Sequence, residues 1–169
     1  MRNLSYAGNL LAISAKTHIR IYDTARYATD DEDSYLFQPK NLKLRDVVSS
    51  LVFRDDGKLL LAGDKSGNIA LVPRSNSLKV MQMYKAEKAA VVALAINPEQ
   101  NTQFAAADGA LTLRIWNLDN YREPAIELEN AHSDYIRDLK YLSRGVLISA
   151  SHDRSIKRWD IREKAAEAT

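Results

Sequence analysis

The amino-acid sequence predicts an all-β fold, a partial β-propeller of about three and a half four-stranded blades. Three observations lead to this prediction. The chain reads as short apolar or alternating runs separated by turn residues, the pattern of β-strands. Asp-Gly dipeptides, at 56–57 and 108–109, fall between such runs, as in β-hairpins. The whole pattern recurs about every 40–45 residues, the length of a propeller blade.

The first two units follow this order with one irregularity. The first, about 1–40, holds LAISA and HIRIYDT but shows no clear innermost strand, so we expect it to be incomplete. Its acidic segment 30–33 is expected to be an insertion, which explains the long first interval. The second unit, about 41–84, runs VVSSLVF, KLLLAG and NIALV, with an outer strand expected around SLKVMQMY.

The last two units repeat the order. The third, about 85–129, runs VVALAI, QFAAA and LTLRIW, with the outer strand AIELE. The fourth, about 130–165, runs YIRDLKYL, VLISAS and SIKRW and is expected to lack its outer strand. Because closed propellers have typically 4–8 blades, we expect a piece of a longer propeller or a ring that a partner completes.

Composition excludes several functional classes. The 169 residues are 46% hydrophobic and 27% charged, as in a soluble globular domain. A net charge of +2 does not indicate bulk affinity for nucleic acid. The absence of cysteine excludes disulfides and thiolate metal sites. No apolar run approaches the roughly 20 residues that span a bilayer, so we expect no membrane partner. No motif indicates a cofactor or a small-molecule substrate.

The fourth unit carries the most specific pattern. It opens on His132, passes through a Ser-x-Ser-x-Asp turn with Ser149 and Asp153, and closes on Trp159 followed by Asp160. This order is similar to one blade of a WD-repeat propeller. The resemblance implies a buried hydrogen-bond network from the indole through the hydroxyl and the imidazole to the carboxylate. We therefore expect these four residues to be a structural clamp.

An alternative interpretation of the same residues is a Ser-His-Asp hydrolase triad. It is disfavoured because Ser149 belongs to an ordinary strand run and has no Gly-x-Ser-x-Gly turn around it. The other units carry weaker versions of the clamp. Trp116 remains in the third, with Glu87 at the histidine position, whereas Val72 and Tyr22 replace the tryptophan in the second and first.

Metal ligands are scarce, and basic residues are frequent in the fourth unit. The chain has three histidines, and His132 and His152 lack the spacing of a zinc site, so we expect no metal. The basic residues indicate either a solvated outer face or a contact with RNA phosphates or an acidic partner. The candidate contact residues are Arg137, Lys140, Arg144, Arg154, Lys157 and Arg158.

Three motif blocks resemble one family. They are Arg45-Asp46 followed by Phe53-Arg54-Asp55-Asp56-Gly57 and Leu60-Leu61-Ala62-Gly63, the string from His132 to Arg137 (HSDYIR), and LAISAKTHIRIYD in the first unit. In their order along the chain, these blocks resemble the family of WD-repeat small nucleolar RNA-associated proteins numbered fifteen in the small-subunit processome. The third unit departs from the family at 105–109, AAADG. The family's further blades and its helical C-terminal domain, which docks other subunits, have no counterpart in these residues.

The resemblance implies a function. We expect a non-enzymatic, nucleolar scaffold of the transcription-linked processome subcomplex that supports pre-rRNA processing and 18S rRNA maturation. Its implied partners are other processome WD-repeat subunits and the 5′ leader of pre-rRNA. The alternatives are a generic WD-repeat adaptor with no RNA role, such as a substrate receptor or trafficking scaffold, and a hydrolase that uses His132, Ser149 and Asp153.

Overall fold

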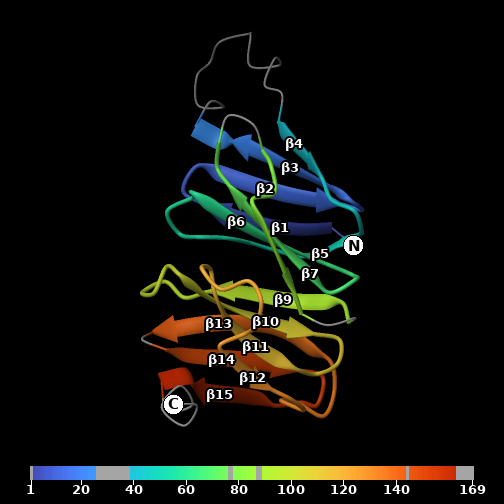
Figure 1. Ribbon diagram of the computed structural model, residues 1–169, viewed down its shortest axis with the longest axis vertical. Helices are drawn as coiled ribbons and strands as arrows, with labels where there is room; N and C mark the ends of the chain where they lie inside the picture. Colours follow the sequence, from blue (N-terminus) through green and yellow to red (C-terminus); the bar gives the residue numbers. More distant parts are fainter. Residues whose placement is uncertain (1, 26–38, 76–77, 87–88, 144, 163–169) are drawn as a thin grey trace.

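The structure consists of four antiparallel β-sheets, which confirms the predicted all-β fold class (Figure 1). The computed structural model describes residues 2–25, 39–75, 78–86, 89–143 and 145–162. In each sheet every strand pairs with the next strand along the chain. Short turns with Asp, Gly and Asn make these pairings local, because such residues favour tight reversals of the backbone.

The sheets contain fifteen strands among the described residues. The first sheet is formed by β1 (Arg2–Ala7), β2 (Leu10–Ala15), β3 (His18–Asp23) and β4 (Lys40–Lys43). The second is formed by β5 (Val48–Phe53), β6 (Leu59–Asp64), β7 (Asn68–Pro73) and β8 (Gln82–Lys85). The third is formed by β9 (Val91–Ile96), β10 (Gln103–Asp108), β11 (Leu113–Asn117) and β12 (Ile126–Leu128). The fourth has three strands within the described part, β13 (Ile136–Ser143), β14 (Val146–Ser151) and β15 (Ile156–Asp160).

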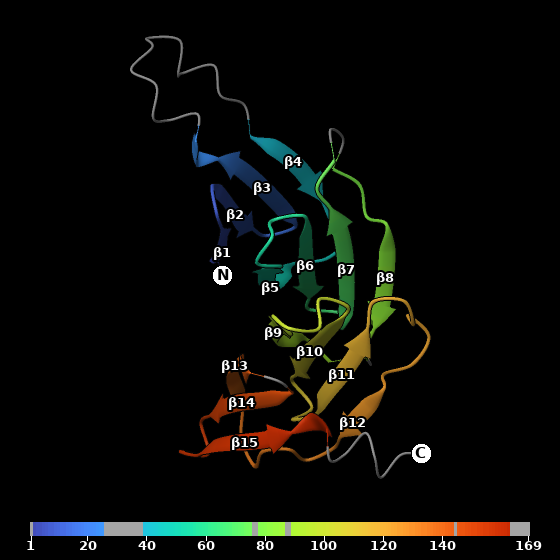
Figure 2. The ribbon, with the colours of Figure 1, turned by 90° about the vertical axis from the view of Figure 1, so that its left-hand side faces the viewer.

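The four sheets are arranged as a fan (Figure 2). The first strand of each sheet lies at the inner edge, where β1, β5, β9 and β13 contact one another in succession. The strands β4, β8 and β12 lie at the outer edge (Figure 2). This order, with the first strand innermost, is that of propeller blades.

An apolar core lies between each pair of neighbouring sheets. Ile19 and Leu60 belong to the core between the first and second sheets, and Leu71 and Trp116 to the core between the second and third. Leu147 packs in the core between the third and fourth sheets. Because the second and third sheets are covered on both faces, β6 and β10 are almost continuously buried.

Strand β1 corrects the prediction that the first unit lacks a clear innermost strand. β1 pairs with β2 along its whole length. Two of its inward side chains are polar: Asn3 donates to the carbonyl of Val48 over 3.3 Å, and Ser5 Oγ accepts from the backbone N–H of Phe53 over 2.8 Å. Leu4 and Tyr6 point outward and are more than half exposed. This reversed polarity hides the strand from a search for buried apolar residues.

The predicted boundaries need two adjustments. The first sheet extends to residue 43, because β4 pairs with β3 through Ile19↔Leu42 and its neighbours. A unit boundary after residue 40 would therefore assign most of β4 to the second unit. The outer strand of the second unit is limited to β8 within the expected SLKVMQMY stretch and extends one residue past it. The acidic segment 30–33 lies outside the described residues.

Three inner strands carry a β-bulge at the same place. In β5 the pairing with β6 passes from Val48 to Ser50, in β9 the pairing with β10 skips position 92, and in β13 the pairing with β14 skips position 137. The residues that have no cross-strand partner at these bulges are Ser49, Val92 and Arg137. A bulge bends the strand and re-aims the side chain at the extra position.

Candidate functional site

The fourth sheet brings His132, Ser149, Asp153 and Trp159 together in one hydrogen-bond chain, which we call the clamp. The indole N–H of Trp159 donates to Oγ of Ser149 over 2.8 Å, and this Oγ lies 2.6 Å from Nε2 of His132. Nδ1 of His132 lies 2.8 Å from a carboxylate oxygen of Asp153. His132 and Ser149 are buried. The clamp therefore ties β14 and β15 to the segment that precedes β13.

The carboxylate of Asp153 is the anchor of the clamp. Its Oδ1 accepts from the hydroxyl of Ser155 over 2.6 Å and from the backbone N–H of the same residue over 2.9 Å. Its Oδ2 accepts from the backbone N–H of Ser133 over 3.2 Å. The hydrogen bond from the Ser155 hydroxyl, with those from His132 and the two backbone groups, holds the pKa of Asp153 well below its usual range, against the opposing effect of burial. Asp153 is therefore a charged acceptor at neutral pH.

The connectivity of the clamp is also that of a Ser-His-Asp triad, and burial decides between the two interpretations. Ser149 is 0% exposed, so a substrate has no access to its Oγ in the folded sheet. The same oxygen already accepts the Trp159 indole N–H. A nucleophile needs an open approach to its oxygen. The geometry favours the clamp, and its stabilising role stays a prediction.

The third sheet keeps the tryptophan but replaces the rest of the clamp. Trp116 is buried, and its Nε1 has no hydrogen-bond partner among the described residues. Ala106 pairs with the residue two positions before Trp116, as Ser149 does with the residue two positions before Trp159. An alanine thus stands where the fourth sheet supplies its hydroxyl acceptor.

A buried ion pair occupies this sheet instead. Arg114 is 5% exposed, hydrogen-bonds the carboxylate of Asp108 and lies 2.6 Å from a carboxylate oxygen of Glu127 on β12. Sequence reasoning missed these residues. The available signal was two opposite charges, Asp108 and Arg114, next to the apolar runs of β10 and β11, since buried charges are normally paired.

Restoring the acceptor in the third sheet is expected to stabilise the protein. In the variant Ala106→Ser, the new hydroxyl can accept from Nε1 of Trp116, and we expect a gain of about 1 kcal/mol in the free energy of unfolding. Urea unfolding measures it. The matched control is Ala105→Ser, which places a hydroxyl in the apolar core on the other face and should lower stability. Equal destabilisation by both variants would contradict the structural equivalence of Ala106 and Ser149.

The predicted basic contact residues are spread over the strands of the fourth sheet, and Lys140 and Arg158 share one face because both pair with Ile148. Two lie on β13 at the inner edge of the fan, two lie on β15 with β14 between them, and one lies in the β14–β15 turn. Neighbouring strands are about 4.8 Å apart, so the β13 and β15 groups are separated by a strand. These residues are Arg137 and Lys140, Lys157 and Arg158, and Arg154. Arg144 lies outside the described residues.

Lys157 is already engaged within the sheet. Its ammonium group donates to the carbonyl of Ala131 over 2.6 Å and lies 5.9 Å from the centre of the Trp159 ring. A cation over an indole face is attracted by the ring quadrupole. Lys157 therefore supports the clamp, which makes it a poor candidate for a contact with a partner.

The end of β15 gives the protein an acid-sensitive ion pair. Asp160 accepts from the guanidinium of Arg162 over 2.6 and 3.0 Å, and Arg158 lies 3.8 Å away. The hydrogen bonds from Arg162 lower the pKa of Asp160 from 3.8 to about 2. Because the folded state lowers this pKa, the stabilisation is complete above the unfolded value and is lost as the pH falls through about 2.

We therefore expect the urea concentration at the unfolding midpoint to decrease as the pH is lowered from 4 to 2. We expect the decrease to be smaller in the variant Asp160→Asn. Unfolding curves at a series of pH values measure the slope. The control Glu129→Gln removes one exposed carboxylate and should leave the slope of the parent protein. An unchanged slope in Asp160→Asn would exclude this ion pair as a source of the acid sensitivity.

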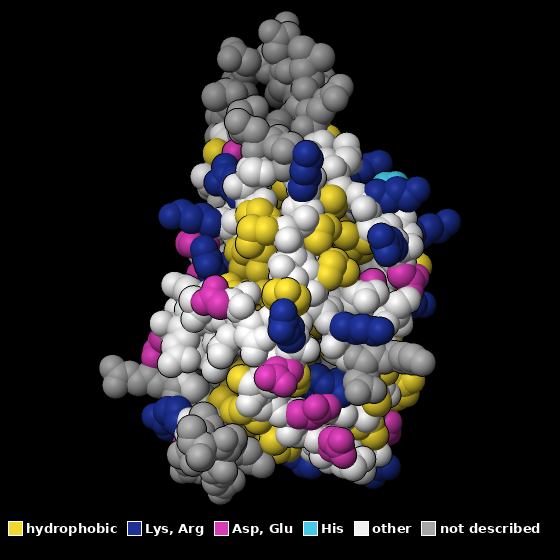
Figure 3. Space-filling view, viewed as in Figure 1, with side chains coloured by type: hydrophobic (Ala, Val, Ile, Leu, Met, Phe, Trp, Pro, Cys, Tyr) yellow, Lys and Arg dark blue, Asp and Glu magenta, His cyan; other side chains and the backbone are white. Residues whose placement is uncertain are grey.

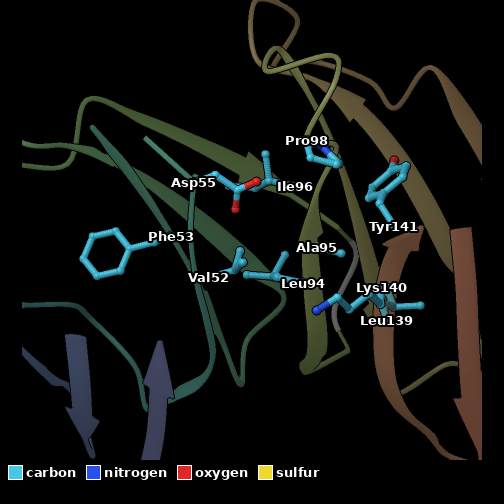
Figure 4. Close-up of a pocket in the computed structure, with 10 residues that line it drawn as sticks. All are labelled: Val52, Phe53, Asp55, Leu94, Ala95, Ile96, Pro98, Leu139, Lys140 and Tyr141. Carbon is cyan, nitrogen blue, oxygen red and sulfur yellow. The ribbon is translucent and has the colours of Figure 1, made fainter. Parts of the chain in front are cut away.

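A cleft of about 240 Å³ lies at the inner edge of the fan, between the second, third and fourth sheets (Figure 4). Val52, Leu94 and Ile96 supply apolar lining, whereas Asp55 and Lys140 are exposed charges. None of the lining residues is Ser, Thr, His or Cys. The full lining is Val52, Phe53, Asp55, Leu94, Ala95, Ile96, Pro98, Leu139, Lys140 and Tyr141.

Tyr141 is the most unusual residue of this lining. It is 5% exposed, and its hydroxyl has no hydrogen-bond partner within the described part of the chain. Burial raises the pKa of this phenol far above its ordinary value. Figure 4 shows its ring beside Pro98. The hydroxyl is thus neutral at physiological pH.

Two other kinds of site were sought in the described residues. No group of three or more His, Asp or Glu side chains there is placed to hold a metal ion. No helix there has the length and apolar character that a membrane span requires.

Comparison with known proteins agrees with the fold. Residues 124–160 match the family model described as WD domain, G-beta repeat. The chain is 29% identical over 126 residues, 73% of its length, to U3 small nucleolar RNA-associated protein 15 of Saccharomyces cerevisiae. It is 27% identical over 160 residues, 94% of its length, to the U3 small nucleolar RNA-associated protein 15 homolog of Gallus gallus.

A second group of relatives carries another name. The chain is 26% identical over 156 residues, 91% of its length, to WD repeat-containing protein 1 of Bos taurus. These alignments cover 24%, 28% and 24% of the yeast, chicken and bovine proteins, so the chain spans about a quarter of the length of these relatives. The matched repeat and the four antiparallel sheets show that this chain contains WD-repeat sequence and folds as blades of the propeller type.

Proposed function

We propose that this chain belongs to a non-enzymatic scaffold subunit of the small-subunit processome, which supports pre-rRNA processing and 40S ribosome biogenesis in the nucleolus. The observation that carries the proposal is the similarity to U3 small nucleolar RNA-associated proteins from yeast and chicken. The partners we propose are other WD-repeat subunits of that particle and the 5′ leader of pre-rRNA.

The architecture supports a scaffold rather than a catalyst. The Ser149 hydroxyl of the clamp is buried, and the imidazole of His132 beside it takes part in holding the strands together. The sheets are joined by apolar cores, which makes the fan a rigid platform with exposed turns at both ends. Rigid sheets that present loops are suited to binding several partners at once.

The second candidate is a WD-repeat adaptor with no RNA role. It is favoured by the similarity to WD repeat-containing protein 1, which covers more of this chain than the yeast alignment does. Fold alone does not separate the two, because propellers serve many unrelated assemblies.

Affinity purification of the tagged full-length protein from its source cells separates the two candidates. We expect U3 small nucleolar RNA and pre-rRNA to be enriched with the protein over an untagged control. We also expect depletion of the protein to raise the ratio of unprocessed pre-rRNA to 18S rRNA. Recovery of other proteins without either RNA, together with normal 18S rRNA in depleted cells, would reject the processome proposal in favour of the adaptor.

A further inference from the structure

Positive charge is concentrated in a part of the molecule that the sequence motifs did not single out. Lys and Arg outnumber Asp and Glu in the described residues of the first two sheets, whereas Asp and Glu outnumber them in the third and fourth. Figure 3 shows Lys and Arg side chains gathered along the right-hand side of the upper half of the molecule. This distribution directs attention to the first two sheets.

Backbone hydrogen bonds bring the segments that carry this charge to one end of the fan. The N–H of Leu44 donates to the carbonyl of Thr17 over 2.8 Å, and that of Val48 donates to the carbonyl of Lys16 over 2.9 Å. These bonds join the β2–β3 turn to the segment between β4 and β5. The first sheet and the connection to the second therefore meet at this end.

The second sheet contributes to the same end. The N–H of Lys65 donates to the carbonyl of Val47 over 3.0 Å, so the β6–β7 turn lies against the β4–β5 segment. The N–H of Ala86 donates to the carbonyl of Gly67 over 2.9 Å, which brings the end of β8 to this turn. Four segments from two sheets thus form one continuous surface.

Six exposed basic or titratable side chains project from these four segments, and we call this surface the basic end. His18 and Lys43 are cross-strand partners on β3 and β4, so two of the side chains lie next to each other on one face. Each of the six is exposed, and none forms an ion pair with a carboxylate of the described residues. The basic end consists of Lys16, His18, Lys43, Arg45, Lys65 and Lys85.

The nearest carboxylates are engaged elsewhere. Asp64 is 3% exposed and accepts from the backbone N–H groups of Ser66 and Asn68 in its own turn. Asp46 accepts from the hydroxyl of Ser66 and from the N–H of Val47, and these bonds lower its pKa, with a smaller effect from Lys65. The positive charges of the basic end therefore lack a full set of counter-charges within the fold.

We propose that the basic end binds the phosphate backbone of an RNA strand, an inference that rests on the proposed processome function. Repeated positive charges on a rigid surface suit a polymer with one negative charge per nucleotide. An acidic protein segment would normally add apolar anchors to such a contact. Among the described residues, the one large exposed hydrophobic side chain that adjoins these segments is Met83, two positions before Lys85 on β8.

The test measures binding of the full-length protein to a single-stranded oligouridine of about twenty nucleotides, by fluorescence anisotropy at several KCl concentrations. The test variant combines Lys43→Gln, Arg45→Gln and Lys65→Gln. The matched control combines Lys58→Gln, Lys79→Gln and Arg122→Gln, which removes the same charges from turns that lie at the other ends of the strands. A third variant removes Arg137, Lys140 and Arg158 in the same way.

We expect the test variant to lose about tenfold or more in affinity and its salt slope to fall by about 0.7 for each lost phosphate contact. The control should keep the affinity and slope of the parent protein. Equal losses in test and control, or a larger loss in the fourth-sheet variant, would overturn the assignment of the surface. Preferential displacement of the RNA by polyglutamate would assign it to an acidic protein instead.

The outcomes also separate this inference from the function on which it rests. If U3 small nucleolar RNA co-purifies with the protein and the test variant binds oligouridine normally, the scaffold function stands. The assignment of the basic end as the RNA-binding surface is then wrong. If the test variant loses binding while no U3 RNA is recovered from cells, the surface is correct and the processome assignment fails.

Discussion

Replacing Gly63 with alanine is expected to destabilise the protein by about 1–3 kcal/mol, because the added methyl group overpacks a close approach of three strands. Gly63 lies on β6, and a Cβ atom at this position would lie 2.5 Å from Oγ of Ser50 and 2.5 Å from Cγ1 of Val91. These atoms belong to β5 and to β9 of the next sheet. The methyl group would therefore push the second and third sheets apart. The free energy of urea unfolding measures the effect.

Two further variants make this prediction specific. The control Gly109→Ala adds the same methyl group where the nearest atoms, in Ala90, lie 3.8 Å away, so we expect a change of less than about 0.5 kcal/mol. The double variant Gly63→Ala with Val91→Ala removes one of the two clashing groups and should show favourable coupling between the sites. Additive losses in the double variant would place the cause of the Gly63 effect elsewhere.

Replacing Ser149 with alanine is expected to lower the free energy of unfolding by about 1–3 kcal/mol. The substitution removes the oxygen that accepts from Nε1 of Trp159 and that lies 2.6 Å from Nε2 of His132. The buried Nε2 of His132 and the part-buried Nε1 of Trp159 are then left without this partner, and an unpaired buried polar group costs more than an average hydrogen bond contributes. Urea unfolding of the variant measures the loss.

The control is Ser133→Ala, which alters an exposed side chain of the same clamp region and keeps the backbone N–H that binds Asp153. We expect it to change stability by less than about 0.5 kcal/mol. The pair also addresses the hydrolase alternative. If Ser149→Ala abolished an ester-hydrolysing activity of the purified protein and left its stability intact, the clamp interpretation would be wrong.

The fold class could be predicted because the sequence of each buried strand alone shows that the strand is buried. β6 and β10 are covered on both faces and read as apolar runs, and their turns contain Asp and Gly, so the repeat is visible without knowing any tertiary contact. The clamp residues were predicted by resemblance to a WD repeat. The structure links all four by successive contacts of hydrogen-bond length, from Trp159 to Ser149, then to His132 and then to Asp153.

The other features depend on contacts that local patterns do not reveal. β1 carries its polar side chains inward, so alternation alone assigns its apolar residues to the wrong face. The ion pair between Arg114 and Asp108 becomes apparent only when β10 and β11 are paired. The basic end unites residues from four separate segments, whereas a count along the chain favoured the fourth unit because its arginines and lysines are close in sequence.

The repeated bulge at Ser49, Val92 and Arg137 sets the curvature of three inner strands at the same place. The three residues share neither size, polarity nor charge, and the hydroxyl of Ser49 donates to the carbonyl of Val91 in the next sheet over 2.6 Å. Deleting the extra residue would leave the pairing on both sides of it in place, because Val48 already pairs with Asp64 and Ser50 with Gly63, and would remove only the local bend of the strand. A single-residue deletion at the bulge should therefore keep every side chain of the inner strand on its present face and change the curvature of that strand.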